Sequence, residues 1–501
     1  MRVLPIFLVL IFSACSQTPV PKNTIVIGME TDVVSLDPRY ATDAVSTNVC
    51  RLVYAGLMRR DEKMELRPWL AQSVALTGAA TYEIKLKTNA MFQDGRPLTS
   101  ADVRFTINSI LDERNGSPLR NGLGDVLSVD TPDTFTVVVK LKEPYAPFVG
   151  NLTFGIVPEG SGDLSGKPVG AGPFRVASRQ RGAELALVRN DYYFEKMPAL
   201  SGVIFKIVPE ETVRLLELSK GNLHIVTSPI MPAMLPWLES RKNIRVERKP
   251  GTNVSYIGFN LNDQYLKNLR VRRAIAHAID RDAIIKHFLK DTAVKTTTLI
   301  APANEFHMEE IPVEYDPEKS KRLLDEAGYR DPGDGRPRFK LVFKTSKNPE
   351  RRKMAEIFSE YLRSVGIGLD IKSYEWGTFF SDVKSGNFQL YSLTWVGMAD
   401  PDALRFIFHS KYAPPKGLNR GRYENVELDK LLDDGKTETD IVKRKRLYNQ
   451  AQRTLSEELP FINLWTQVNL AAVDRRVKGF VIYPDEGFDS LATAELSGLE
   501  E

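Results

Sequence analysis

Hydrophobic and polar positions early in the chain follow the two-residue period of half-buried strands. Residues 24–30 form a short β-branched run, which predicts a first strand. Residues 81–87 and 133–141 alternate in polarity, as antiparallel strands with one buried face do. A helix is expected between these two strands, over residues 100–111. We therefore predict an α+β arrangement for this part of the chain.

Further along, strands alternate with helices. Residues 203–208 predict a strand, 211–220 a helix that Gly221 ends, and 223–226 another strand. The same order recurs as a strand, a helix ended by Gly366 and a strand, over residues 338–344, 350–365 and 367–374. Such units are typical of parallel α/β packing, so we predict two α/β lobes with an inserted piece.

Two further helices have clear signals. Residues 271–279 place apolar side chains on one helical face. Residues 315–329 have Asp316 at the N-cap, Pro317 at the first helical position and Gly328 just past the end.

The N-terminus resembles an export signal. Arg2 precedes an apolar run over residues 3–12, which is about half the length that a membrane-spanning helix needs, so a transmembrane enzyme or channel is excluded. Small residues lead to Cys15, although Phe12 replaces the usual leucine of a lipoprotein signal. We predict a signal peptide over residues 1–15 with Cys15 as the lipid attachment site, followed by a tether over 16–23. Alternatively, Cys15 belongs to an ordinary cleaved signal.

Composition narrows the class of protein. The 501 residues suffice for two to four folding units, and 42% hydrophobic with 26% charged residues is ordinary for a soluble globular chain. The net charge of +4 comes from interleaved signs, which argues against a nucleic-acid partner or a polybasic membrane surface.

No catalytic or metal-binding motif stands out. The glycine-rich residues 161–172 fail the P-loop spacing, there is no Gly-x-Ser-x-Gly, and none of the five histidines begins a His-Glu-x-x-His helix. Cys50 lies among Val49, Val53 and Leu57, a spacing that favours a buried helix face over a reactive thiol. We expect no enzyme activity, no metal and no cofactor.

Asp400 and Asp402 form a carboxylate pair that could in principle do acid–base work. Because Asp400 precedes Pro401, we expect it to cap a helix that runs through Leu404 and Phe408. The same carboxylate could also bind a ligand.

Six segments carry a resemblance to a known family. They are SLDPRYATDAVSTNVCRLVYAGL (35–57), FQDGRPLTSADVRFT (92–106), VGAGPFRV (169–176), LKNLRVRRAIAHAIDR (266–281), YDPEKSKRLLDEAGY (315–329) and LNRGRYENVELDKLLDDG (418–435). In this order they resemble the family 5 extracellular solute-binding proteins, the peptide and nickel receptors of ABC importers.

The resemblance implies a periplasmic-binding-protein-like (type II) Venus flytrap with two α/β lobes and an extra inserted domain. Domain I would comprise residues 24–53, 167–260 and 469–501, domain II the insertion over 54–166, and domain III residues 261–468. Solute bound between the lobes would stabilise the closed form.

The resemblance also implies a function. The protein would be an exported lipoprotein, periplasmic or at the cell surface, that captures di- or oligopeptides and delivers them to a membrane permease and its ATPase. We expect a monomer. The alternatives are a receptor for a nickel chelate, an opine or another small solute, and, from a different class, an extracellular enzyme or signalling module on the same scaffold.

Ligand contacts carry over by position. The loop over residues 41–46 suggests Thr42 and Ala44, and the end of a strand suggests Trp395 and Gly397, although Trp395 could equally be a core residue. Peptide receptors of this family usually have an Asp three residues after that tryptophan, which binds the peptide ammonium, and this chain has Met398 there. Asp400 could substitute, in which case Asp400→Asn would weaken peptide binding by about 1.5–3 kcal/mol.

Cys15 generates the first testable prediction. Cys15→Ser should release the protein from membranes because the acylated thiol would be its only anchor, while solute affinity stays unchanged. Membrane fractionation with calorimetry of the released protein measures both. Continued membrane retention would contradict lipid attachment at Cys15.

Overall fold

The fold is described from a computed structural model that covers residues 22–123, 125–227, 229–309 and 313–498. The predicted signal peptide, Cys15 and most of the predicted tether lie outside these residues. Among the described residues, no helix is both long and apolar enough to cross a membrane.

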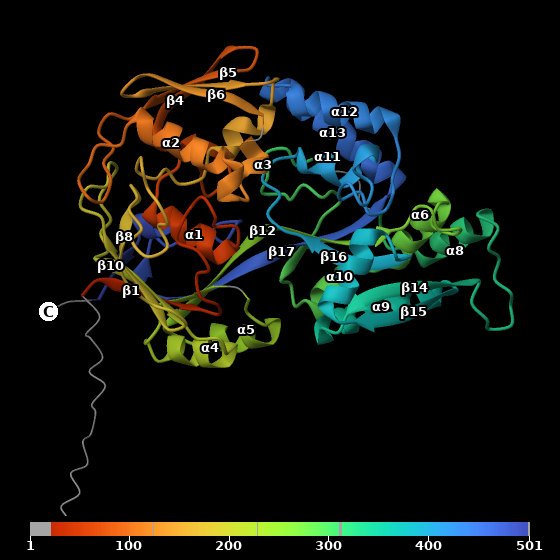
Figure 1. Ribbon diagram of the computed structural model, residues 1–501. Coiled ribbons are helices and arrows are strands. Elements are labelled where there is room, and N and C mark those ends of the chain that lie inside the picture. Colours follow the sequence, from red (N-terminus) through yellow and green to blue (C-terminus); the bar gives the residue numbers. More distant parts are fainter. Residues whose placement is uncertain (1–21, 124, 228, 310–312, 499–501) are drawn as a thin grey trace, which may run out of the picture.

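One eleven-stranded sheet runs through the molecule in the order β15-β14-β16-β12-β17-β11-β1-β10-β9-β8, with β13 added against β17. Its centre is the antiparallel pair of β12 (Ile244–Phe259) and β17 (Phe461–Asp474). Figure 1 shows this pair between the β8–β10 side and the β14–β15 side.

On one side of the pair lies the first predicted strand–helix–strand unit. β10 (Gly202–Ile207) leads through α4 (Glu211–Ser219) to β11 (Ile225–Thr227), and both strands pair in parallel with β1 (Thr24–Met29). Gly221, with φ of +81°, follows the helix as predicted. The antiparallel strands β9 (Glu184–Arg189) and β8 (Phe174–Gln180) complete this edge of the sheet.

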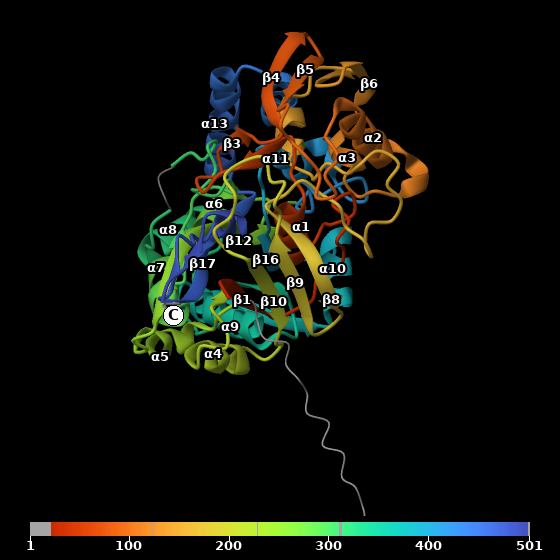
Figure 2. The same cartoon turned by 90° about the vertical axis from the view of Figure 1, so that its left-hand side faces the viewer.

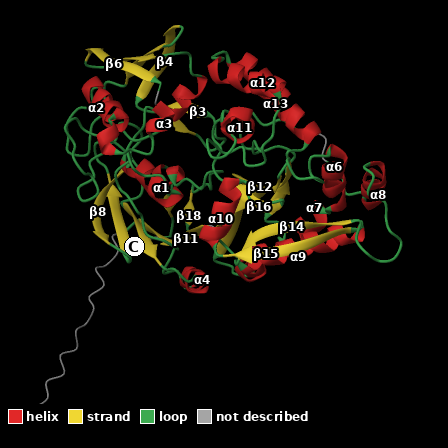
Figure 3. Cartoon of the chain, turned by 45° about the vertical axis from the view of Figure 1, so that its right-hand side comes forward, coloured by secondary structure: helices red, strands yellow, loops and turns green. Residues whose placement is uncertain are grey.

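On the other side the second unit is confirmed. β14 (Phe339–Ser346) leads through α9 (Pro349–Ser364) to the parallel strand β15 (Ile367–Tyr374), and β14 also pairs in parallel with β16 (Leu390–Trp395). Helices cover this half, as Figure 3 shows. They include α6 (Leu269–Ala278), α8 (Pro317–Glu326), α10 (Trp376–Ser385), α12 (Val426–Thr437) and α13 (Ile441–Glu458).

A separate four-stranded antiparallel sheet stands apart from the large one (Figure 2). Its order is β4 (Ala71–Gly78), β5 (Thr81–Leu86), β7 (Thr136–Leu141) and β6 (Val126–Asp133), and α2 (Ser100–Leu111) packs on it. The single strand predicted over 133–141 is wrong at its start. Asp133 ends β6 and its carboxylate accepts the Phe135 N–H at 2.9 Å, which forms the turn into β7.

Ten further short elements lie between or beside these. They are β2 (Met58–Arg60), β3 (Leu66–Pro68), α3 (Arg120–Leu123), the 3-10 helix η2 (Ala146–Asn151), α5 (Leu235–Glu239), α7 (Arg281–Ala283), β13 (Ala293–Lys295), α11 (Ala403–Phe408), β18 (Val477–Lys478) and β19 (Glu495–Leu496).

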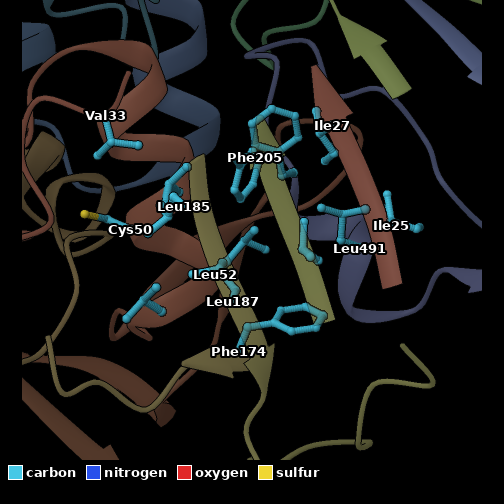
Figure 4. Packing of buried hydrophobic residues seen from close by; sticks show 14 of the residues in the cluster. Ile25, Ile27, Val33, Cys50, Leu52, Phe174, Leu185, Leu187, Phe205 and Leu491 are labelled. Carbon is cyan, nitrogen blue, oxygen red and sulfur yellow. The ribbon is translucent and has the colours of Figure 1, made fainter. Parts of the chain in front are cut away.

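The core beside β1 includes the helix α1 (Ala44–Val53), as the spacing around Cys50 predicts. Cys50 packs in one cluster with Ile27, Leu52, Phe205 and residues of β9, shown in Figure 4. Burial, helped by the charges of nearby aspartates, raises the pKa of the Cys50 thiol, so the reactive thiolate is suppressed. The prediction of a buried structural cysteine is confirmed.

The β12–β17 pairing is interrupted between Pro250 and Val254, where the register shifts. Instead of pairing with β17, Thr252 donates its N–H to the Pro484 carbonyl at 3.2 Å. We call residues 250–254 the ladder break. It separates the part of β12 that pairs only with β17 from the part that also pairs with β16.

Gly258, just past the ladder break, generates a stability prediction. A Cβ there would lie 2.5 Å from ring atoms of Tyr391, so Gly258→Ala should lower the free energy of unfolding by about 1–3 kcal/mol through overpacking. Gly162→Ala is the control, because no atom lies within 4 Å of its Cβ position. Equal urea midpoints for the two variants would contradict the close approach at Tyr391.

Candidate functional site

Two adjoining cavities lie between the part of the chain that contains β2 and η2 and the end of β16 in the large sheet. The first cavity, of about 440 Å³, is lined by α1, β2, residues 150–155, Thr252 of the ladder break and Asp485. The second cavity, of about 400 Å³, lies between η2 and the segment that follows β16. Both volumes are in the range of small-molecule sites. Residues that line both cavities are Arg60, Gly150, Asn151, Gly397 and Ala399.

Trp395 ends β16 and lines the second cavity. It pairs with Val254 at the ladder break, and its ring stacks on Tyr256 with centroids 6.0 Å apart. The Arg420 guanidinium lies 5.0 Å from its ring centroid. Packing therefore fixes the indole while part of it faces the cavity, so the residue has features of both a core and a site position.

Gly397 connects the second cavity to the ladder break. It has φ of +63°, and its N–H donates to the Asn253 side-chain oxygen at 3.2 Å. The next residue, Met398, is 6% exposed and packs in the apolar cluster around Tyr391. A thioether occupies the position at which the family resemblance would place a carboxylate.

Asp400 lines the second cavity but is already engaged. Its two oxygens accept from the Arg444 guanidinium at 2.6 and 3.0 Å, and one also accepts the Asp402 N–H at 2.8 Å. Burial opposes the charge of Arg444, but the bond to Asp400 raises its pKa overall. The carboxylate serves as the counter-charge of a buried arginine.

The prediction that Asp400 caps the following helix is wrong. Helix α11 begins at Ala403 with Asp402 at the N-cap position, so Asp400 lies too early. Its pairing with Arg444 and its bond to the Asp402 N–H hold it in the turn before the helix. Asp402 pairs with Arg405 at 2.8 Å, and that pair is buried, which leaves neither carboxylate free for acid–base work.

Thr42 and Ala44 lie at the start of α1 and are exposed. The N-cap of α1 is Asp43, whose side chain accepts the Ser46 N–H. From the same segment Ala41 and Thr47, rather than Thr42 and Ala44, line the first cavity. The structure thus brings Trp395, Gly397 and Asp400 together and leaves Thr42 and Ala44 outside both cavities.

Charged residues that the sequence did not single out shape the first cavity. Arg51 is partly buried and pairs with Asp485 at 2.6 Å and Asp489 at 3.1 Å. Burial acts to raise the pKa of Asp485, but the charge of Arg51 holds that pKa below its ordinary value. For Asp489 burial is the stronger effect, so its pKa is raised despite the same arginine. These partners are more than 400 positions apart in sequence, so no local pattern could reveal them.

The described residues do not form a metal-binding cluster. No group of three or more His, Cys, Asp or Glu side chains among them gathers in a way that could hold an ion.

Comparisons with known proteins identify the chain. Residues 65–414 match the family described as bacterial extracellular solute-binding proteins, family 5. The oligopeptide-binding protein AppA of Bacillus subtilis is 28% identical over 93% of this chain and 90% of its own. The glutathione-binding protein GsiB of Escherichia coli is 27% identical, with 93% of each chain covered.

Solved structures agree with these sequence matches. AppA of B. subtilis in complex with a nonapeptide is 26% identical with a TM-score of 0.74, and the alignment covers 95% of this chain and 99% of AppA. NikZ of Campylobacter jejuni in complex with Ni(L-His) is 25% identical with a TM-score of 0.76, over 95% of this chain and all of NikZ.

The chain therefore belongs to the family 5 bacterial extracellular solute-binding proteins. Its fold is that of a type II periplasmic binding protein, as the sequence resemblance implied. It is a binding protein of the ABC-transporter kind and not an enzyme.

Asp400 generates a stability prediction. Asp400→Asn should lower the free energy of unfolding by about 1.5–3 kcal/mol, because buried Arg444 loses a charged hydrogen-bond partner. Asp370→Asn is the control, since its pair with Lys372 is about half exposed on both sides. Urea unfolding compares them, and equal losses would contradict the structural role of the Asp400–Arg444 pair.

Proposed function

We propose that this protein captures di- or oligopeptides between its two lobes and delivers them to the permease and ATPase of an ABC importer. The observation that carries the proposal is the pair of adjoining cavities. Their walls come from both sides of the molecule, so one solute in both cavities would touch both lobes.

The walls of the two cavities suit the extended main chain of a bound peptide. Gly150, Gly397 and Ala399 bring backbone rather than bulky side chains to the boundary of the two cavities, and Asn151 adds a side-chain amide. Peptide receptors gain affinity from hydrogen bonds to the ligand main chain, which such walls can offer to many sequences. AppA, a relative over nearly the whole chain, is an oligopeptide-binding protein.

Closure would occur about the ladder break, which on β12 lies a few residues before the proposed domain boundary at 260 and faces the boundary at 468 on β17. In this proposal domain I comprises residues 24–53, 167–260 and 469–501, domain II residues 54–166, and domain III residues 261–468. Residues 251–253, between the paired residues Pro250 and Val254, lie outside the strand register and supply backbone that can absorb a rotation of one lobe against the other.

Export and anchoring belong to the same proposal. Cys15, if acylated, would hold the protein at the membrane beside its permease through the tether over residues 16–23. We further propose that it acts there as a monomer.

A second candidate, a nickel chelate or another small solute, is favoured by one observation. Met398 is buried and Asp400 is paired with Arg444, so neither of these two described residues offers a free carboxylate to a peptide ammonium. NikZ, whose solved structure contains Ni(L-His), matches this chain over its full length.

Native mass spectrometry of the form that lacks residues 1–15, purified without denaturation, tests the proposal. A closed receptor retains its solute, so we expect a ladder of co-purifying peptide masses. A single metal-chelate or small-molecule mass would contradict the peptide assignment and support the second candidate.

A further inference from the structure

Arg60 occupies the boundary between the two cavities. It ends β2 and lines both cavities. Its guanidinium lies beside Gly150, since a Cβ built on that glycine would be 3.6 Å from Nη2. The other amino nitrogen, Nη1, donates to the Met64 carbonyl at 2.9 Å, which fixes the direction of the side chain.

Arg60 has no carboxylate at ion-pair distance among the residues that the structure describes. The acidic groups that act on it from farther away are Asp400, Glu305 and Asp485. Each of these already pairs with another basic side chain, namely Arg444 at 2.6 Å, Lys445 at 3.0 Å and Arg51 at 2.6 Å. These three carboxylates are therefore engaged elsewhere, and the positive charge of Arg51 acts against that of Arg60.

An arginine in this position is costly unless an anion accompanies it. Burial lowers the pKa of Arg60, against the attraction of the three distant carboxylates, yet a guanidinium stays charged in proteins. Its neighbour Arg59 differs, because it pairs with Glu195 at 2.9 Å and stacks on Trp69. Of the two adjacent arginines, Arg59 thus has a carboxylate partner, and Arg60 has none among the described residues.

We propose that Arg60 binds a carboxylate of the solute and so selects solutes that present an anionic group where the two cavities meet. The inference rests on the proposed function, which it makes more specific. In a peptide the carboxylate would come from the C-terminus or from an acidic side chain. A guanidinium binds either through paired N–H donors.

The charges around the second cavity agree with this assignment. A peptide receptor that recognised the ammonium end would need a free carboxylate, and Asp400 is bound to Arg444. Recognition would depend instead on the opposite charge, supplied by Arg60 at the end of β2 rather than by the segment after β16.

Calorimetry of the full chain in detergent tests the assignment. The probes are alanine–glycine peptides of graded length, as free acids, as C-terminal amides, and as amides that carry one glutamate. We expect the free acids to bind wild type about tenfold to 100-fold more tightly than the plain amides, as one charged hydrogen-bonded pair requires. Binding of the glutamate amides would assign the carboxylate to a side chain.

Arg60→Gln should remove this preference, so that acids and amides bind equally weakly, and Arg60→Lys should restore part of it. Arg67→Gln is the matched control, because Arg67 lies on β3 of the same hairpin, is half exposed and pairs with Asp61. Unfolding midpoints identify any variant that fails to fold, and Arg60→Lys then carries the test.

The outcomes separate the two proposals. If acids and amides bind wild type equally, or if Arg60→Gln weakens both to the same extent, Arg60 does not bind the solute carboxylate, and the peptide function stands. If no peptide of any kind binds wild type, the peptide function fails, and the assignment of Arg60 fails with it.

Discussion

The structure depends on the antiparallel pairing of β12 with β17. These two long strands are the only ones in the described sheet that join its β14–β16 half to its β1–β11 half. β16 pairs with the outer edge of β12, and β11 pairs with the outer edge of β17. The cavities lie near the place where the pairing of β12 with β17 is interrupted. The same pair therefore holds the lobes together and supplies the backbone about which we propose they move.

Charge pairing at the site explains why family resemblance alone gives an incomplete account of it. Trp395 ends β16 and the segment after it carries a carboxylate, but that carboxylate neutralises Arg444. At the boundary of the cavities, Arg60 donates through Nη1 to the Met64 carbonyl and has no carboxylate at ion-pair distance among the described residues. A fold shared with peptide and nickel-complex receptors can thus present a different charge to its solute, because a few ion pairs decide which groups remain available.

Local signals made much of the fold predictable. The bounds of α8 follow within a few residues from the N-cap at Asp316, Pro317 and the glycine at 328. The alternation of strands and helices correctly predicted two parallel units. Elements without such signals were missed. β6 has no regular alternation of buried and exposed positions, and β12 contains Pro250 and Gly251, which interrupt any strand pattern.

The site was less predictable because its interactions are not local. Trp395, Gly397 and Asp400 lie together at one cavity, and their role as ligand contacts stays a prediction. Nothing in the sequence around Asp400 shows that Arg444 binds it, and nothing around Arg60 shows that its neighbouring carboxylates are paired elsewhere. Such facts depend on which distant segments the fold brings together.

The central claim is that solute binding draws the two lobes together. Spin labels at Leu76→Cys on β4 and Val426→Cys on α12, both exposed, report the distance across the cavities by double electron–electron resonance, in a form without residues 1–15. Cys50 is buried and should not react with the label. We predict a shorter and narrower distance distribution when peptide is added. An unchanged distribution at peptide concentrations that saturate the protein in calorimetry would contradict the account.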